Sequence, residues 1–392
     1  MIRLECNKWK RLTLIPALAL AALALWAPSA PAQVIITGND SRAQLVNGQL
    51  KIDPSGEQSV SIIDIGANGP RVRATLPALN SIFGPPTNLQ VTPDDKLALV
   101  AEAVKLNEDN SKFVPSDKLH VIDLEANPPK VIDSVTVGLQ PSGLSISPNG
   151  KLVLVANRGE TSVSVLSIEG KKVTMLGKVD TKEQVAHVVF FPDGKRALID
   201  KSTSNKVSFL AIDGTNVTVA GPEITVGWFP YNSDITPDGK LALVANTGAN
   251  GRSDGNEDSI SVIDVEANPP RIIDVLAAGD APEGISISPT GKVAVTGNLC
   301  GSDQGPEAWW FRKQGCIQVF GIEGKKVTHL KEITVGGVPE ALAFSADGRW
   351  LLVGNLLDSN VAVFNVHGTQ LTETSTRMAL PGHPAAMRGR AR

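Results

Sequence analysis

A short turn recurs along this chain at intervals of 44 to 57 residues. Its copies are PDDK at Pro93, PNGK at Pro148, PDGK at Pro192 and Pro237, PTGK at Pro289 and ADGR at Ala346. Each copy stands between two runs of alternating apolar residues, and proline, asparagine, aspartate and glycine are typical of tight turns. A second marker, such as SVSIIDI from Ser59 or NVAVFNV from Asn360, occurs seven times. The pattern predicts seven copies of one strand-rich unit.

The spacing of the turns gives the size of the unit. Once the extra residues between each turn and the following marker are removed, successive turns lie 44 or 45 residues apart. All of these insertions therefore fall in one loop, between the second and third strands of a unit. A period of about 44 residues is that of a propeller blade. The sequence predicts an all-β fold, a seven-bladed β-propeller of four-stranded antiparallel blades.

The first unit lacks its first strand. QVIITGND, from Gln33, matches the second strand KVAVTGNL, from Lys292. LPGHPAAM, from Leu380, matches VGGVPEAL, a segment that contains the start of a first strand. We therefore expect the C-terminal strand to join the N-terminal blade. This pairing would close the ring and remove its open edges.

The ends of the second strands carry a degenerate tetrapeptide: LVAN at Leu154 and Leu243, VTGN at Val295 and LVGN at Leu352. With these motifs the chain resembles the seven-bladed YVTN-repeat propellers, a family that includes lactonase-like proteins, over residues 33–392. The family also contains redox-enzyme subunits and binding proteins. The resemblance therefore implies the fold and leaves these functions open.

Residues 1–32 have the pattern of a cleavable signal peptide. A basic segment precedes an apolar run, Leu12 to Trp26, and Ala-Pro-Ala stands before Gln33. The run is shorter than the roughly 20 residues of a spanning helix, although an uncleaved anchor is the alternative. We expect a signal peptide, residues 1–32, followed by a single propeller domain, residues 33–392, in a periplasmic or secreted protein.

Without residues 1–32 the chain has 33 Lys and Arg against 39 Asp and Glu, a net charge of −6. This charge argues against nucleic acid and, after signal cleavage, an anionic membrane as partners. The expected partner is a small molecule or another periplasmic protein, and the propeller itself is expected to be a monomer.

The inserted loops share one face with the starts of the first strands, which line the mouth of a propeller channel. The candidate catalytic residues there are Glu283, Glu340, His187 and His383, because carboxylates and imidazoles serve as general acids, bases or metal ligands. A hydrated polar plug is the alternative. The candidate ligand-binding residues on this face are Asn88, Tyr231, Asn232, Arg158 and Lys201.

The largest internal insertion, CGSDQGPEAWWFRKQGC, contains two of the three cysteines of the chain. In an oxidising compartment a disulfide bond between Cys300 and Cys316 is expected. It would hold Trp309, Trp310 and Arg312 as further ligand-binding candidates, in a lid over the channel or a partner epitope. Packing of both Trp side chains on the blades is the alternative.

No motif identifies a cofactor, and a divalent metal stays open as a possibility. The first functional hypothesis is a small-molecule site at the channel mouth with lactonase-like hydrolysis. The alternatives are a non-catalytic binding or scaffold protein that uses the Trp-rich loop, and a propeller subunit of a redox enzyme.

Overall fold

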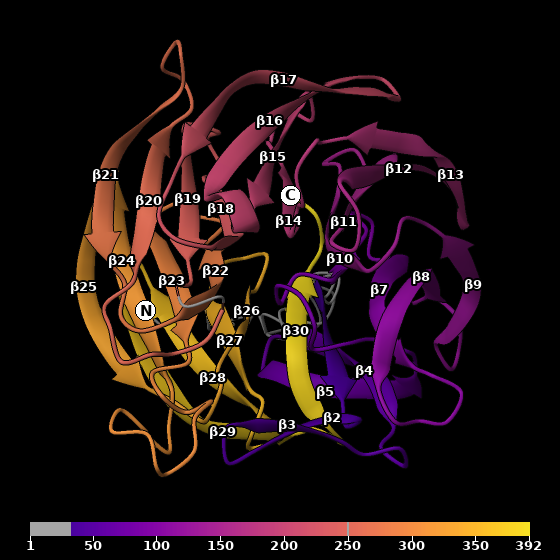
Figure 1. Cartoon of the computed structure of the whole chain (residues 1–392), viewed down its shortest axis with the longest axis vertical. Helices are drawn as coiled ribbons and strands as arrows, with labels where there is room; N and C mark the ends of the chain where they lie inside the picture. Colours follow the sequence, from indigo (N-terminus) through magenta and orange to yellow (C-terminus); the bar gives the residue numbers. More distant parts are fainter. Residues whose placement is uncertain (1–32, 249–250) are drawn as a thin grey trace, which may run out of the picture. The chain divides into compact units, whose positions relative to one another are not determined.

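The structure is a computed structural model that describes residues 33–248 and 251–392. These residues form seven four-stranded antiparallel sheets and one additional two-stranded hairpin. The predicted all-β, seven-bladed propeller is confirmed (Figure 1). The expected signal peptide lies outside the described residues. Within the described residues, no helix has the length and apolar character needed to cross a membrane.

The ring closes between the two ends of the propeller. The first blade has the order β30-β1-β4-β5, so that β30 is the inner strand (Figure 1). The register pairs Ile35 of β1 with Gly389 of β30 and with Ile63 of β4. The prediction that the C-terminal strand joins the N-terminal blade is therefore confirmed. Its strands are β1 (Gln33–Asp40), β4 (Gln58–Gly66), β5 (Gly69–Pro77) and β30 (His383–Gly389).

The other six blades follow in chain order, each with its first strand innermost. Blades 2 to 4 consist of β6 (Leu89–Val91), β7 (Leu97–Leu106), β8 (Phe113–Asp123) and β9 (Lys130–Thr136); β10 (Pro141–Ile146), β11 (Leu152–Asn157), β12 (Ser162–Glu169) and β13 (Lys172–Asp180); and β14 (His187–Phe190), β15 (Arg196–Lys201), β16 (Lys206–Asp213) and β17 (Asn216–Thr225). A short 3₁₀ helix, Ser202–Ser204, follows β15.

Blades 5 to 7 consist of β18 (Pro230–Ile235), β19 (Leu241–Asn246), β20 (Ser259–Asp264) and β21 (Arg271–Ala277); β22 (Pro282–Ile287), β23 (Val293–Asn298), β24 (Cys316–Glu323) and β25 (Lys326–Thr334); and β26 (Ala341–Phe344), β27 (Trp350–Asn355), β28 (Asn360–His367) and β29 (Gln370–Ala379).

The strands of a blade differ in burial because of their distance from the centre. The second strand β11 is buried at every position, whereas the outer strand β9 is mostly exposed. The hydrophobic clusters join neighbouring blades, since the apolar residues of β7 and β8 pack against those of β10 and β11. Each blade thus buries its faces only against its neighbours, as in other repeat architectures.

The inserted second-to-third loops carry extra structure. In blade 1 this loop contains the hairpin of β2 (Ala43–Val46) and β3 (Gln49–Ile52), and in blade 2 the strands β7 and β8 continue beyond the blade. Residues 388–392 cross the channel at the opposite face, where Arg388 donates a hydrogen bond to the carbonyl of Leu144. Arg392 binds the carbonyl of Ile287 and the carboxylate of Asp234.

Candidate functional site

Three inserted loops meet above the channel mouth, and together they form the lid: the β2–β3 hairpin, residues 251–258 of blade 5 and residues 299–315 of blade 6 (the aromatic loop). The hairpin tip touches the aromatic loop, since a Cβ on Gly48 would lie 2.6 Å from the backbone nitrogen of Gly305. The guanidinium of Arg252 donates hydrogen bonds to the carbonyls of Gly48 (2.8 Å) and Asp303 (3.2 Å). One arginine therefore ties together loops from three blades.

Polar and apolar contacts fasten the lid beneath its surface. The carboxylate of Asp303 is buried and accepts hydrogen bonds from the backbone and the hydroxyl of Ser253. Leu45 of the hairpin packs on a buried apolar cluster that includes Leu299 and Ala385. The hairpin of blade 1 thus reaches over side chains from other blades, and the lid covers the channel mouth.

Glu283 and Glu340, here called the acid pair, lie beneath the lid. Glu283 is the second residue of β22 and Glu340 directly precedes β26, so adjacent blades bring the two inner-strand starts together. Both side chains are buried, with 9% and 4% of their surfaces exposed. The two carboxyl groups lie close enough for each to shift the pKa of the other.

Burial governs the protonation of the acid pair. The pKa of Glu283 is raised to about 7, mainly by loss of solvation. The nearby Asp303 contributes to this rise, whereas Glu340, Arg158 and Arg252 oppose it. Burial and the neighbouring Glu283 charge raise the pKa of Glu340 well above its ordinary value. Two carboxyl groups in one buried site cannot both ionise readily, so near neutral pH they hold at least one proton between them.

Arg158 and Tyr231 complete the charged part of the site. Arg158 follows β11 and donates a hydrogen bond to the hydroxyl of Tyr231 over 3.4 Å. Tyr231 is buried and stacks on Phe229, with ring centroids 5.6 Å apart. Its pKa is raised by burial and by the charges of the acid pair. The structure thus brings Glu283, Glu340, Tyr231 and Arg158 near one another, and their role in a site stays a prediction.

His187 lies at the start of β14 and is fully buried. Its Nδ1 is 3.3 Å from a carboxylate oxygen of Asp200 and 3.3 Å from the hydroxyl of Ser233. Its Nε2 has no partner among the described residues, nor have Asn88 Oδ1 and Ser142 Oγ at the same level of the channel. Because buried polar groups are normally paired, these atoms favour water or a polar ligand at the mouth.

Asn232 closes the channel below this level. Its amide nitrogen donates to the hydroxyl of Thr87 in the connection to blade 2, and its amide oxygen accepts from the backbone nitrogen of Ile285 in blade 6. One side chain thus bridges blades on opposite sides of the channel. We therefore assign Asn232 to the floor of the site.

Two of the predicted site residues, His383 and Lys201, bind other groups of the protein. The Nδ1 of His383 lies 2.9 Å from the carbonyl of Leu356 and 3.2 Å from the hydroxyl of Ser359, contacts that join the closing strand to blade 7. Lys201 is buried and its ammonium group pairs with Glu183 (3.1 Å) and Glu223. The structure gives both side chains structural partners within the blades.

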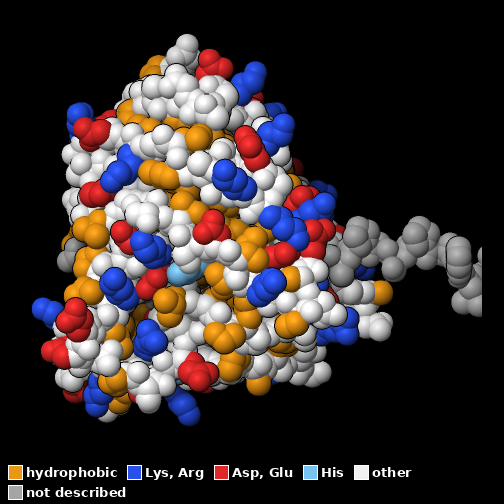
Figure 2. Space-filling view, turned by 90° about the vertical axis from the view of Figure 1, so that its right-hand side faces the viewer, with side chains coloured by type: hydrophobic (Ala, Val, Ile, Leu, Met, Phe, Trp, Pro, Cys, Tyr) orange, Lys and Arg blue, Asp and Glu red, His pale blue; other side chains and the backbone are white. Residues whose placement is uncertain are grey.

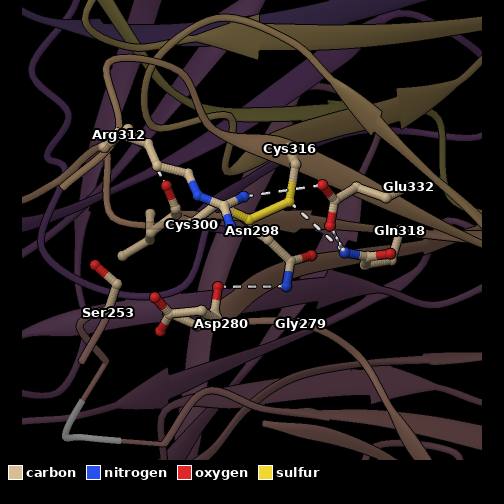
Figure 3. The surroundings of a disulfide bond; sticks show 12 residues. Ser253, Gly279, Asp280, Asn298, Cys300, Arg312, Cys316, Gln318 and Glu332 are labelled. Atoms are coloured by element: carbon tan, nitrogen blue, oxygen red, sulfur yellow. Dashed lines mark hydrogen bonds and ion pairs between the residues drawn. A yellow bond between two sulfur atoms is a disulfide. The ribbon is translucent and has the colours of Figure 1, made fainter. Parts of the chain in front are cut away.

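The Cys300–Cys316 disulfide bond is present and closes the base of the aromatic loop (Figure 3). Trp309 and Trp310 touch edge to face, and Gly255 of the blade 5 loop lies against both. Trp309 is 80% exposed, and the loop lines a cleft of about 320 Å³ together with Asp280.

Arg312 is mostly exposed and faces Glu332, which also accepts a hydrogen bond from Gln318 (Figure 3). This side chain, like the two Trp, therefore lines the outer cleft. The acid pair is not among the residues that line it.

A metal ion has little support among the described residues. Cys300, Cys316 and Glu332 form the one group of three potential ligands that lie close enough to share an ion. The disulfide bond removes both thiolates, which are the ligating forms of cysteine. At the channel mouth, the guanidinium of Arg158 already supplies positive charge next to Glu283.

Comparison with known proteins agrees with this architecture. Residues 99–226 match the family model described as lactonase, 7-bladed beta-propeller. The chain is a seven-bladed propeller, and its residues 99–226 are similar to the lactonase family. No curated protein matches its sequence.

Solved structures resemble this propeller along most of its length. The periplasmic gluconolactonase of Pseudomonas aeruginosa is 17% identical, with a TM-score of 0.65 over 91% of this chain and 99% of that one. A candidate 6-phosphogluconolactonase of Bacteroides uniformis gives 16% identity and a TM-score of 0.67 over 92% and 100%. Kuenenia stuttgartiensis hydrazine synthase gives 17% identity and a TM-score of 0.59 over 79% and 90%. At these sequence identities the similarity between the structures is a similarity of fold.

The sequence predicted the aromatic loop as a lid over the channel, but not the other parts that build the lid. Neither the β2–β3 hairpin nor the buried Asp303 was predicted. The alternation in QLVNGQL, with Asn-Gly at its centre, is a hairpin signal that could have revealed the hairpin. The partner of Asp303 comes from another blade, and nothing local in the sequence indicates it.

Proposed function

We propose that the protein hydrolyses a small lactone at the channel mouth beneath the lid. The observation that carries this proposal is the acid pair. Near neutral pH Glu340 keeps its proton, whereas Glu283 loses its proton. A general base is most effective when its pKa lies near the working pH. The match to the lactonase family and the likeness to a gluconolactonase support the same chemistry.

The roles follow from the two protonation states. The carboxylate of Glu283 removes a proton from a water molecule as the water oxygen bonds to the lactone carbonyl carbon. The guanidinium of Arg158 and the hydroxyl of Tyr231, which contact each other, stabilise the negative charge that develops on the carbonyl oxygen. When the ring carbon–oxygen bond breaks, Glu340 gives its proton to the leaving oxygen. The product is the open hydroxy acid, one water richer than the lactone.

The N-terminal pattern and the disulfide bond support an exported, periplasmic or secreted, protein. In that setting the lactone would reach the protein from outside the cytoplasm. We propose no cofactor for the reaction, because the acid pair and Arg158 provide a base, an acid and an electrophile.

Lactone opening by the purified protein tests this function. The release of acid is followed with an indicator dye for δ-gluconolactone, 6-phosphogluconolactone and γ-butyrolactone, after subtraction of the spontaneous rate. Glu283→Gln should lower kcat by about 100-fold or more, the usual contribution of a general base. The control is Glu266→Gln, which changes an exposed carboxylate on the opposite face that pairs with Lys325. A wild-type protein without activity on these lactones, or a Glu283→Gln protein with full activity, contradicts the proposal.

A second candidate function rests on the aromatic loop. Trp309 is 80% exposed beside Trp310 and Phe311, and large exposed aromatic groups commonly mark binding surfaces. In this alternative the protein binds another periplasmic protein. Trp309→Ala would then abolish a complex purified from the native host while leaving lactone hydrolysis intact.

A further inference from the structure

A histidine of blade 2 lies between a serine and a buried carboxylate. Ser134 of β9 is exposed, and its hydroxyl lies 2.7 Å from Nδ1 of His120 in β8. The Nε2 of His120 lies 3.1 Å from a carboxylate oxygen of Glu102 in β7. Glu102 and His120 are only 3% and 7% exposed. The three side chains form a continuous hydrogen-bonded relay from the interior of the blade to its surface.

In other blades the positions of Glu102 and His120 hold side chains with a structural role. In blade 1, Asn39 donates to Ser61, which bonds to Thr75. Equivalent pairs occur in blade 3, with Asn157 and Ser164, and in blade 5, with Asn246 and Ser261. An amide joined to a hydroxyl satisfies buried polar groups but cannot accept a proton at neutral pH.

The register shows that these positions are equivalent. His120 pairs directly with Ser134 across β8 and β9, as Ser61 pairs with Thr75 across β4 and β5. Blade 2 therefore replaces the amide and the hydroxyl of this repeated position by a carboxylate and an imidazole. A carboxylate that orients an imidazole, which in turn faces a serine hydroxyl, is the arrangement that activates serine as a nucleophile.

The relay opens into a cleft between blades 1 and 2. His120 and Ser134 line this cleft, whose volume is about 720 Å³, which is in the range of small-molecule sites. Its apolar walls include Leu76, Leu79 and Val131, and Arg42 is the positively charged residue in its lining. Figure 2 looks onto the side of the propeller where β8 and β9 lie, and it shows hydrophobic side chains close to a histidine.

We propose that this cleft is a second hydrolytic site, an esterase site for small neutral esters with an apolar acyl group. The hydroxyl oxygen of Ser134 bonds to the ester carbonyl carbon while its proton passes to Nδ1 of His120. Glu102 stabilises the imidazolium that forms. The bond from the carbonyl carbon to the alcohol oxygen then breaks, and His120 gives the proton to the departing alcohol. Water releases the acyl group from Ser134 by the same steps, with His120 again acting first as base and then as acid.

Covalent labelling tests this site directly, because it needs no knowledge of the natural ester. The full chain is incubated with a fluorophosphonate, and the labelled peptide is identified by mass spectrometry. We expect one label per chain, on Ser134, and slow hydrolysis of p-nitrophenyl butyrate. Ser134→Ala should lose both signals. His120→Gln should slow labelling by about 100-fold or more, since the base is then missing.

Two controls separate this site from the rest of the molecule. Ser111→Ala removes another exposed serine of blade 2, one that bonds to Asp109, and should label like the wild type. Glu283→Gln should also label normally, so failure of the lactonase proposal does not affect this result. Thermal unfolding confirms that each variant is folded. A wild type that is not labelled, a label on another residue, or an unchanged rate in His120→Gln would show that the relay is structural only.

Discussion

Replacement of Glu283 by glutamine should change how the stability of the protein depends on pH. Burial raises the pKa of Glu283 from 4.5 to about 7 in the folded protein. The folded state therefore binds this proton more tightly than the unfolded state. The stabilisation is fully present below about pH 4.5 and is lost as the pH rises through 7. The difference between the two pKa values corresponds to about 3 kcal/mol in the free energy of unfolding.

The substitution removes the ionising group and keeps its shape. At pH 5 the wild type and Glu283→Gln should unfold with similar free energies. At pH 8 the variant should be more stable by up to about 3 kcal/mol, because the wild type must then hold a buried carboxylate. Urea unfolding at several pH values, followed by Trp fluorescence, measures both free energies. Where unfolding is reversible and two-state, their difference can be compared at each pH.

The comparison between the two proteins isolates the acid pair. Asp258 and Asp280 also have pKa values raised to about 6 by burial, but they titrate in both proteins and cancel in the difference. Parallel stability curves between pH 5 and 8 would refute the reasoning. They would mean that Glu283 is solvated in the folded protein and that the lid does not cover it.

Three further predictions concern the surroundings of the acid pair. Gly48→Val should loosen the lid, because the backbone there has φ +72° and a Cβ would meet Gly305; faster proteolysis of the hairpin would show it, and wild-type resistance would contradict it. Arg158→Met should shift the pH–rate profile for lactone opening to higher pH, since the guanidinium opposes the rise in the pKa of Glu283; an unmoved profile would argue against this contact. Replacing both Cys300 and Cys316 by serine should cost about 3 kcal/mol of stability by the loop-closure argument, measured by urea unfolding against reduced wild type, which should match the variant.

The architecture could be predicted because it repeats. Each blade is bounded by a tight turn of few possible sequences, so the turns at Pro148, Pro192 and Pro237, which lie 44 and 45 residues apart, show a constant unit. Ring closure followed from the match between the segments at Gln33 and Lys292. Such features depend on local sequence, and local sequence decides turns and alternating strands.

The residues of the candidate site could be predicted only in part. Glu283, Glu340 and Tyr231 stand at the same position of their blades, and a propeller brings these positions together at its channel. His383 begins the inner strand β30 and Lys201 ends the second strand β15, yet they bind Leu356 and Glu223. Whether a side chain faces the channel or a neighbouring strand depends on partners that are distant in sequence.

The chemistry of the site depends on contacts between loops that the sequence did not reveal. Two carboxylates at an open channel mouth would be solvated and would both ionise at neutral pH. The lid raises the pKa of Glu283 because it excludes water, and its Asp303 and Arg252 act on the same carboxylate in opposite directions. The lid in turn exists because the β2–β3 hairpin and the two other loops bind one another. Insertions in the loops of separate blades therefore change the protonation of a carboxyl group at the start of an inner strand.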